Sequence, residues 1–148
     1  MAATRLSLSM DESFVDTNIL LDVLLEREGF YYDALNIWAA AETGKVDAYI
    51  AAITVNNIHY VMKRIKSETT AMIAVRIILR IFKVVPVDAD ILSRAADFHD
   101  KDYEDDIQQQ CAMKARCSQI YTRNPNHYDS SLVAVLPPSA FVYSDDEQ

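Results

Sequence analysis

The segment ESFVDTNILLDVLLE, residues 12–26, joins a short apolar run at Ser13–Val15 to apolar residues with helical spacing over Ile19–Leu25. The same alternation recurs along the chain and predicts four further strands, at 48–51, 84–87, 119–121 and 132–136. Helical patterns are found over 31–43, 55–65, 69–82, 91–99 and 103–116. This order predicts an α/β fold, a three-layer α/β/α arrangement of about five mainly parallel strands with helices on both faces.

The chain has 148 residues, the size of one ordinary domain, so we expect a single domain over 1–148, with a loosely ordered leader at 1–12 and an acidic tail at 144–148. It carries 22 Asp and Glu against 14 Lys and Arg, a net charge of −8. This charge disfavours non-specific coating of nucleic acid. No stretch approaches the roughly 18 apolar residues of a membrane span, and no secretory signal is visible. We therefore expect a cytoplasmic protein without a membrane partner.

Polar residues follow the first two predicted strands, where ligands collect in parallel sheets. Asp16-Thr17-Asn18 follows the first strand. Either Thr17 or Asn18 would suffice to cap the next helix, which leaves Asp16 as a candidate functional carboxylate; the alternative is an ordinary helix cap. After the second strand we expect Thr54 to be an N-cap and Asn57 to face the same edge of the sheet.

Two further segments add acidic and polar groups to this edge. Residues 102–106, DYEDD, hold four carboxylates within five residues, more than helix capping needs. The loop after the fourth strand holds Arg123, a cation suited to phosphate, with Asn124 and Asp129 as possible ligands; the alternative is a simple connection. Repulsion among carboxylates gathered at one edge predicts a compensating Mg²⁺ or Mn²⁺ and a phosphate substrate.

Four stretches together resemble the PIN-domain ribonuclease family, and within it the toxins of bacterial toxin–antitoxin systems. They are FVDTNILLD (14–22), TVNNIHY (54–60), DYEDDIQ (102–108) and TRNP (122–125). The T-R-N-P motif is most similar to a branch that carries Asn at two ligand positions. The resemblance implies a PIN-like fold and an Mg²⁺- or Mn²⁺-dependent endoribonuclease in which water attacks an RNA phosphodiester.

The resemblance also implies a set of site residues. Asp16 and Asp105 match family carboxylates, whereas Asn57 stands where the family commonly has Glu and Asn124 where many members have Asp. Metal binding should therefore be weaker, since each lost carboxylate removes a charged ligand. The expected catalytic residues are Asp16, Asp105, Asn57 and Asn124; the metal ligands are Asp16 and Asp105, with Asp106, Asp102 and Asp129 as further candidates; and the substrate-binding residues are Thr17, Asn18, Thr122 and Arg123.

Alternatives remain open at this point. The main one is a non-catalytic or weakened PIN-like module whose acidic edge binds a basic antitoxin. An aspartate-nucleophile phosphatase is disfavoured because Asn18 stands where its second Asp would be. The expected partners are RNA, an antitoxin and a second copy of the chain. Two groups of residues each allow two interpretations. The apolar group, Tyr31, Tyr32, Leu35 and Trp38, could pack in the core or form an interface with a partner. The basic group, Lys63, Arg64 and Lys66, could contact phosphates or form a solvated helix end.

Overall fold

The computed structural model describes residues 12–142, so the acidic tail and all of the expected leader except Glu12 lie outside the described residues. Glu12 does not belong to a leader, because it begins the first strand. The strands are β1 (Glu12–Val15), β2 (Asp47–Ala51), β3 (Lys83–Val85), β4 (Gln119–Tyr121) and β5 (Ala134–Leu136). The helices are α2 (Thr17–Leu24), α3 (Tyr31–Glu42), α4 (Ala52–Ile65), α5 (Glu68–Ile81), α6 (Ala89–Asp97) and α7 (Tyr103–Lys114), with short 3₁₀ helices η1 (Pro125–His127) and η2 (Pro138–Ala140).

The five strands form one parallel sheet in the order β3-β2-β1-β4-β5. The chain builds one half of the sheet outward from β1 and then returns to the other side of β1 with β4. Residues 13–15 of β1 pair with residues 119–121 of β4. The carboxyl ends of β1 and β4 therefore lie next to each other at the point where the strand order reverses, which is the usual ligand position in such sheets.

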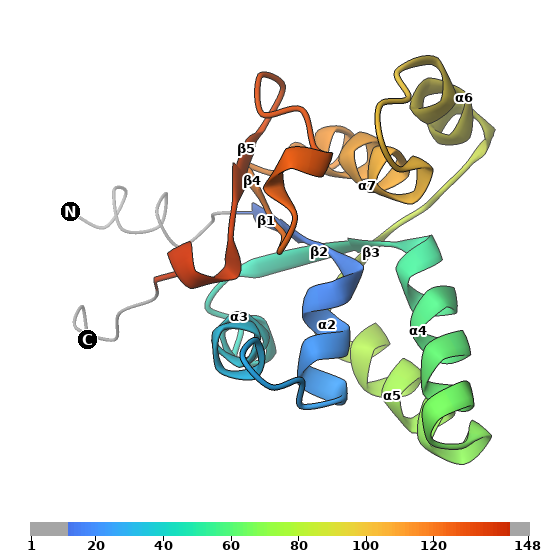
Figure 1. The fold of residues 1–148 in the computed structure, drawn as a ribbon, viewed down its shortest axis with the longest axis vertical. Helices are drawn as coiled ribbons and strands as arrows, with labels where there is room; N and C mark the ends of the chain where they lie inside the picture. Colours follow the sequence, from blue (N-terminus) through green and yellow to red (C-terminus); the bar gives the residue numbers. More distant parts are fainter. Residues whose placement is uncertain (1–11, 143–148) are drawn as a thin grey trace.

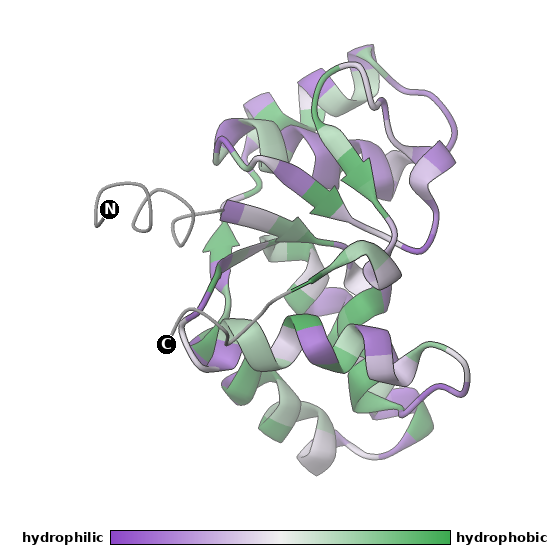
Figure 2. Cartoon of the chain, turned by 90° about the vertical axis from the view of Figure 1, so that its left-hand side faces the viewer, coloured by the Kyte–Doolittle hydropathy of each residue, from purple (hydrophilic) through white to green (hydrophobic). Residues whose placement is uncertain are grey.

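Helices cover both faces of the sheet, with α6 and α7 on one side and α2 to α5 on the other (Figure 1). The alternation of side chains along each strand separates two cores. Phe14 and Ile120 pack with α6 and α7, whereas Val15 and Tyr121 pack with α2 to α5. Figure 2 shows hydrophobic and hydrophilic residues alternating along the helices, as expected for helices with one buried side. The predicted three-layer α/β/α fold is confirmed.

Most predicted elements form within a few residues of their expected bounds. The fifth strand begins at Ala134 instead of residue 132. Trp38 is buried and packs edge-on against Phe82, but Tyr32 is 78% exposed, so the expected aromatic cluster divides between core and surface. Within residues 12–142, no helix is both long enough and apolar enough to cross a membrane.

Candidate functional site

A cavity of about 290 Å³ opens at the carboxyl ends of β1 and β4, and we call it the acidic mouth. Side chains from α2, α4, α7 and the loop after β4 line it. The ribbons of these segments come together at the carboxyl edge of the sheet (Figure 1). Its lining residues are Asp16, Thr17, Asn18, Leu21, Asn57, Tyr60, Val61, Asp102, Glu104, Asp105, Asn124 and His127.

Asp16 lies at the centre of this site and is 2% exposed. Its Oδ1 accepts from the backbone N of Asn18 at 3.0 Å, and Asp16 is the N-cap of α2. Its Oδ2 accepts from the hydroxyls of Thr122 at 2.8 Å and Tyr128 at 2.7 Å. The expectation that Asp16 is left over from capping is therefore wrong: one oxygen caps the helix, and the other is held by the loop after β4.

Asp105 shares the mouth with Asp16. Its Oδ1 accepts from Gln108 Nε2 at 3.2 Å, and its Oδ2 lies 2.9 Å from His127 Nδ1. The Tyr128 hydroxyl lies 3.3 Å from Asp105 Oδ1, so this phenol sits between the two carboxylates. Burial, followed by the charge of Asp16, raises the pKa of Asp105 to about 6. The structure thus brings two carboxylates together in a largely buried place, where His127 offsets only part of the cost of ionising Asp105.

Glu104 is a third carboxylate in the mouth, one that the sequence reasoning did not single out. Its Oε2 accepts from Asn57 Nδ2 at 2.6 Å and lies 3.5 Å from Thr17 Oγ1. Burial raises its pKa, and the charge of Asp16 also raises it. The signal in the sequence is the spacing of Glu104 and Gln108, which places both on one side of α7.

Thr54 is not the helix cap expected from the sequence. Strand β2 passes directly into α4, whose N-cap is Ala51, so Thr54 lies inside the first turn. It is fully buried, and its Oγ1 lies 2.7 Å from Thr17 Oγ1. Gln108 Oε1 in turn accepts from the backbone N of Thr17 at 3.1 Å. These neutral hydrogen bonds fix the floor of the mouth and tie α2 to α4 and α7.

The other acidic candidates have different surroundings. Asp102 lines the mouth, but its Oδ1 caps α7 by accepting from the backbone N of Asp105 at 3.0 Å. Asp106 is turned away, because consecutive helical residues point about 100° apart, and its Oδ2 lies 2.6 Å from His99 Nδ1. Asp129 Oδ1 accepts from Ser131 N at 3.0 Å, and Asp129 does not line the mouth. Asp106 and Asp129 are therefore corrected as candidate ligands of this cavity.

Arg123 is not free for phosphate, contrary to the expectation from the sequence. Its Nη2 donates to Asp22 Oδ1 at 3.1 Å. Its Nε lies 2.8 Å from Asp22 Oδ2, without the alignment of a hydrogen bond. Its guanidinium stacks over the ring of Phe30, 3.9 Å from the centroid. Asp22 is fully buried and also lies 3.3 Å from Arg27 Nη1. Arg123 thus neutralises a buried carboxylate and fixes the loop after β4 onto α2.

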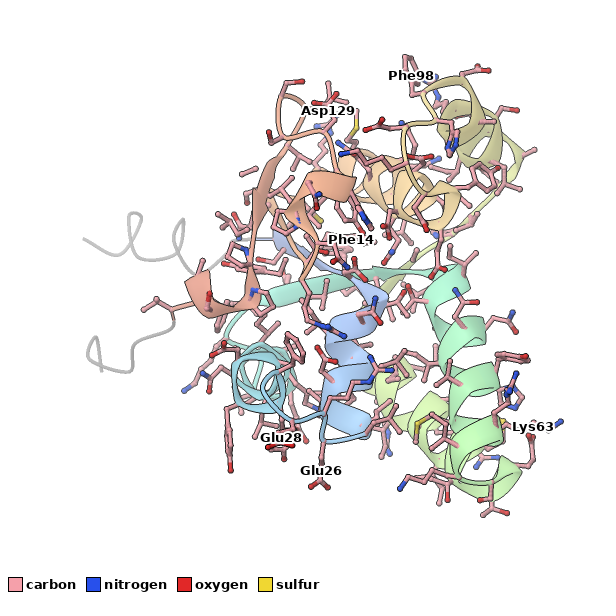
Figure 3. All side chains as sticks on the ribbon, in the orientation of Figure 1. Phe14, Glu26, Glu28, Lys63, Phe98 and Asp129 are labelled. Carbon is pink, nitrogen blue, oxygen red and sulfur yellow. The ribbon has the colours of Figure 1, made fainter. Side chains whose placement is uncertain are left out.

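The remaining expected residues divide in the same way. Asn18, Asn57 and Asn124 line the mouth. Thr122 does not; it is fully buried, and its hydroxyl donates a hydrogen bond to Asp16. Lys63, which Figure 3 labels, lies near the end of α4 that is opposite to Asn57. Arg64 is turned onto Tyr60, whose hydroxyl accepts from its Nη1 at 2.9 Å. Neither basic residue lines the mouth.

The charge of the mouth suits a cation. Four carboxylates line it, those of Asp16, Asp102, Glu104 and Asp105, and no Lys or Arg is among its described lining residues. Hard oxygen donors of this kind are the ligands that Mg²⁺ and Mn²⁺ prefer. Across residues 12–142, however, no three acidic, Cys or His side chains are already arranged as metal ligands. The oxygen ligands therefore fit a divalent ion in their chemistry. Because protein donors already hold these carboxylates, their geometry would have to adjust before they could bind the ion.

Comparison with solved structures shows what this fold resembles. The toxin VapC20 of Mycobacterium tuberculosis, described as cleaving the sarcin-ricin loop, has a TM-score of 0.67 at 19% identity, over 84% of this chain and 99% of that chain. A toxin–antitoxin complex from Klebsiella pneumoniae gives 0.63 at 22% identity, over 85% and 97%. FitAcB from Neisseria gonorrhoeae gives 0.64 at 17% identity, over 87% and 99%. At these identities the likeness shows the fold alone.

Sequence comparison adds the family. No curated protein sequence matches the chain. The family model described as PIN domain matches residues 13–126, which include the four carboxylates and the three asparagines that line the mouth. Because the match spans well over half of the sequence, this chain belongs to the PIN domain family.

Proposed function

We propose that the protein is an Mg²⁺- or Mn²⁺-dependent endoribonuclease of the toxin type, from the branch that carries Asn at positions 57 and 124. One observation carries this proposal: Asp16, Glu104 and Asp105 face one small cavity whose described lining holds no basic side chain except a histidine. The raised pKa values of Glu104 and Asp105, caused first by burial and further by the charge of Asp16, support it, because a bound cation would stabilise both ionised carboxylates.

Each residue would have a distinct role. Asp16 and Asp105 would hold the ion, and Glu104 would supply the third charge, positioned by the amide of Asn57. Thr122 would fix the orientation of Asp16. A divalent ion bound there would supply an activated water and neutralise charge on the phosphate. Asn18 and Asn124, at the rim, would contact the RNA.

The decisive experiment is cleavage of mixed RNA by the purified protein with Mn²⁺ or Mg²⁺, compared between wild type and Asp16→Asn. We expect cleavage that requires the ion and disappears in the variant. The Mn²⁺ affinity of Asp16→Asn, measured by calorimetry on the same samples, should also be lower than that of the wild type. Asp90→Asn is a matched control, since Asp90 lies on the surface of α6, where it pairs with Arg94, and does not line the mouth. Absence of ion-dependent cleavage at high protein concentration would refute the catalytic proposal.

A second candidate is favoured by the state of the mouth. Its carboxylates already have protein donors, so the same charge could instead receive a guanidinium from a basic antitoxin. The toxin–antitoxin complex among the similar structures is consistent with such a partner. Tight binding of an Arg-containing peptide without ion-dependent cleavage would favour this function. In either case we propose a cytoplasmic protein that forms a homodimer.

A further inference from the structure

A second cavity, of about 430 Å³, lies beside the acidic mouth, and we call it the side cavity. It opens between the connection from α6 to α7 and the loop before β5, and Figure 3 labels Phe98 and Asp129 on these two segments. Two neighbouring residues, His127 and Tyr128, connect it with the mouth. His127 lines both cavities, and Tyr128 lines the side cavity while its hydroxyl reaches Asp16.

We propose that the side cavity binds one nucleobase of the RNA, adjacent to the phosphate held at the acidic mouth, and that it favours a base with an exocyclic amino group. This inference rests on the proposed function for its substrate. Because the two cavities share a wall, a strand whose phosphate lies at the mouth places the next base at the side cavity. The volume of the cavity falls in the range of small-ligand pockets, about 300–1,000 Å³.

The rim of the side cavity offers a surface for stacking. Phe98 is 69% exposed, and its side chain projects outward from the ribbon in Figure 3. Leu132, on the opposite rim, is 53% exposed. An aromatic ring left open to water at the edge of a cavity can stack on any base.

The polar groups of the cavity suit the edge of a base better than a phosphate. No Lys or Arg is among its described lining residues, and three carboxylates are. Asp106 and Asp129 each use only one oxygen in the hydrogen bonds of the described chain, to His99 and Ser131 respectively. Each keeps a second oxygen that can accept a hydrogen bond. Acceptors without cations repel phosphate and select ligands that donate N–H groups.

The cavity is also held in shape. Gln109 Nε2 donates to the backbone O of Asp129 at 2.9 Å, and Gln109 Oε1 accepts from the backbone N of Asp129 at 2.9 Å. Lys101 Nζ donates to the backbone O of Asn126 at 3.0 Å and ties the two rims together. A preformed wall reduces the ordering cost of binding.

Binding of labelled RNA hexamers tests the proposal without relying on cleavage. Fluorescence anisotropy would be measured for oligo(rC) and oligo(rU), in EDTA and in Ca²⁺, with wild type, Phe98→Ala and Asp129→Asn. The matched control is Tyr32→Ala, which removes an aromatic side chain that is 78% exposed and lines neither cavity. Both aromatic changes lie on the surface, so folding should be retained.

We expect oligo(rC) to bind at least about fivefold more tightly than oligo(rU), since only cytosine carries an amino group. Phe98→Ala should weaken oligo(rC) binding at least about fivefold, the lower end of base-stacking effects. Tyr32→Ala should leave it unchanged, and Asp129→Asn should reduce the preference for cytosine.

Three results would overturn the inference: equal binding by Phe98→Ala and wild type, no preference for cytosine, or no RNA binding in either buffer. Direct binding of labelled hexa-arginine, weakened by Asp129→Asn, together with no RNA binding, would instead assign the cavity to a basic peptide. Failure of the proposed function looks different. If the wild type binds oligo(rC) through Phe98 but never cleaves RNA, the proposed base-binding site is supported and the proposed catalytic activity is refuted.

Discussion

Replacing Arg123 with alanine is expected to destabilise the fold, because this side chain neutralises a buried charge. Asp22 is fully buried and has Arg123 and Arg27 as partners, with Arg123 the closer. Burial raises the pKa of Asp22, and the charge of Arg123 is the largest influence that lowers it again. Without Arg123, Asp22 would remain buried with one weaker partner at 3.3 Å.

The size of the effect follows from that geometry. Breaking a buried ion pair by removing one partner costs about 3–5 kcal/mol. Because Arg27 remains beside Asp22, we expect Arg123→Ala to lower the free energy of unfolding by about 3 kcal/mol, the lower end of this range. The unfolding entropy of a 148-residue chain is roughly 0.3 kcal/mol/K. The Tm of Arg123→Ala should therefore fall by about 10 °C.

Thermal unfolding followed by circular dichroism measures this change, with Asp22→Asn and the double variant completing a cycle. The double variant should be less destabilised than the sum of the single variants, since no buried charge then remains unpaired. The cost of Arg123→Ala should also shrink as the pH falls, because protonation of Asp22 removes the charge. An unchanged Tm together with weaker RNA binding would refute this reasoning and restore Arg123 as a phosphate contact.

Two further predictions concern the acidic mouth. Because the pKa of Asp105 is raised to about 6 in the folded state, its ionised carboxylate destabilises the fold above pH 6. This destabilisation is lost as the pH falls from about 6 to about 4 and the carboxylate becomes protonated. Asp105→Asn should therefore raise the Tm of the metal-free protein near pH 8 but not near pH 4, and wild-type Mn²⁺ affinity measured by calorimetry should fall about tenfold per pH unit below 6. Tyr128→Phe removes one of the two hydroxyl donors to the buried Asp16 Oδ2 and should lower the free energy of unfolding by about 2 kcal/mol in urea titrations, while Mn²⁺ binds more tightly because Oδ2 then keeps only the Thr122 donor. A Tm for Asp105→Asn that follows wild type at every pH, or a Tyr128→Phe variant with unchanged Mn²⁺ affinity, would contradict these accounts.

The sequence was sufficient for the fold because its signals are local. Short apolar runs flanked by polar turns predict buried strands, and the helices between them show their buried side by spacing alone. Where the observed bounds of an element differ from the predicted ones, the way in which neighbouring elements join outweighs the local capping preference. Thr54 is a good capping residue, but β2 ends at Ala51 and leaves no loop in which a cap could act.

The site was only partly predictable, because its decisive contacts join distant residues. Asp22 and Arg123 are 101 positions apart, and Asp16 and Tyr128 are 112 apart. No spacing rule reveals such pairs. The acidic run at 102–106 indicated a concentration of charge but not its direction around α7, which sends Asp105 toward the mouth and Asp106 toward His99.

The net charge of −8 is therefore less informative than the placement of the charges. Several basic side chains are paired with acids: Arg27 and Arg123 with Asp22, Arg94 with Asp90, and Lys83 with Asp47. None of them lines the mouth, whose carboxylates are stabilised instead by neutral hydroxyl and amide donors and by His127. Neutral donors orient carboxylates without cancelling their charge, so the lining of the mouth by itself repels phosphate. In the proposed function, the cation that binds the mouth, either a divalent ion or a guanidinium of a protein partner, would decide whether RNA or that partner occupies it.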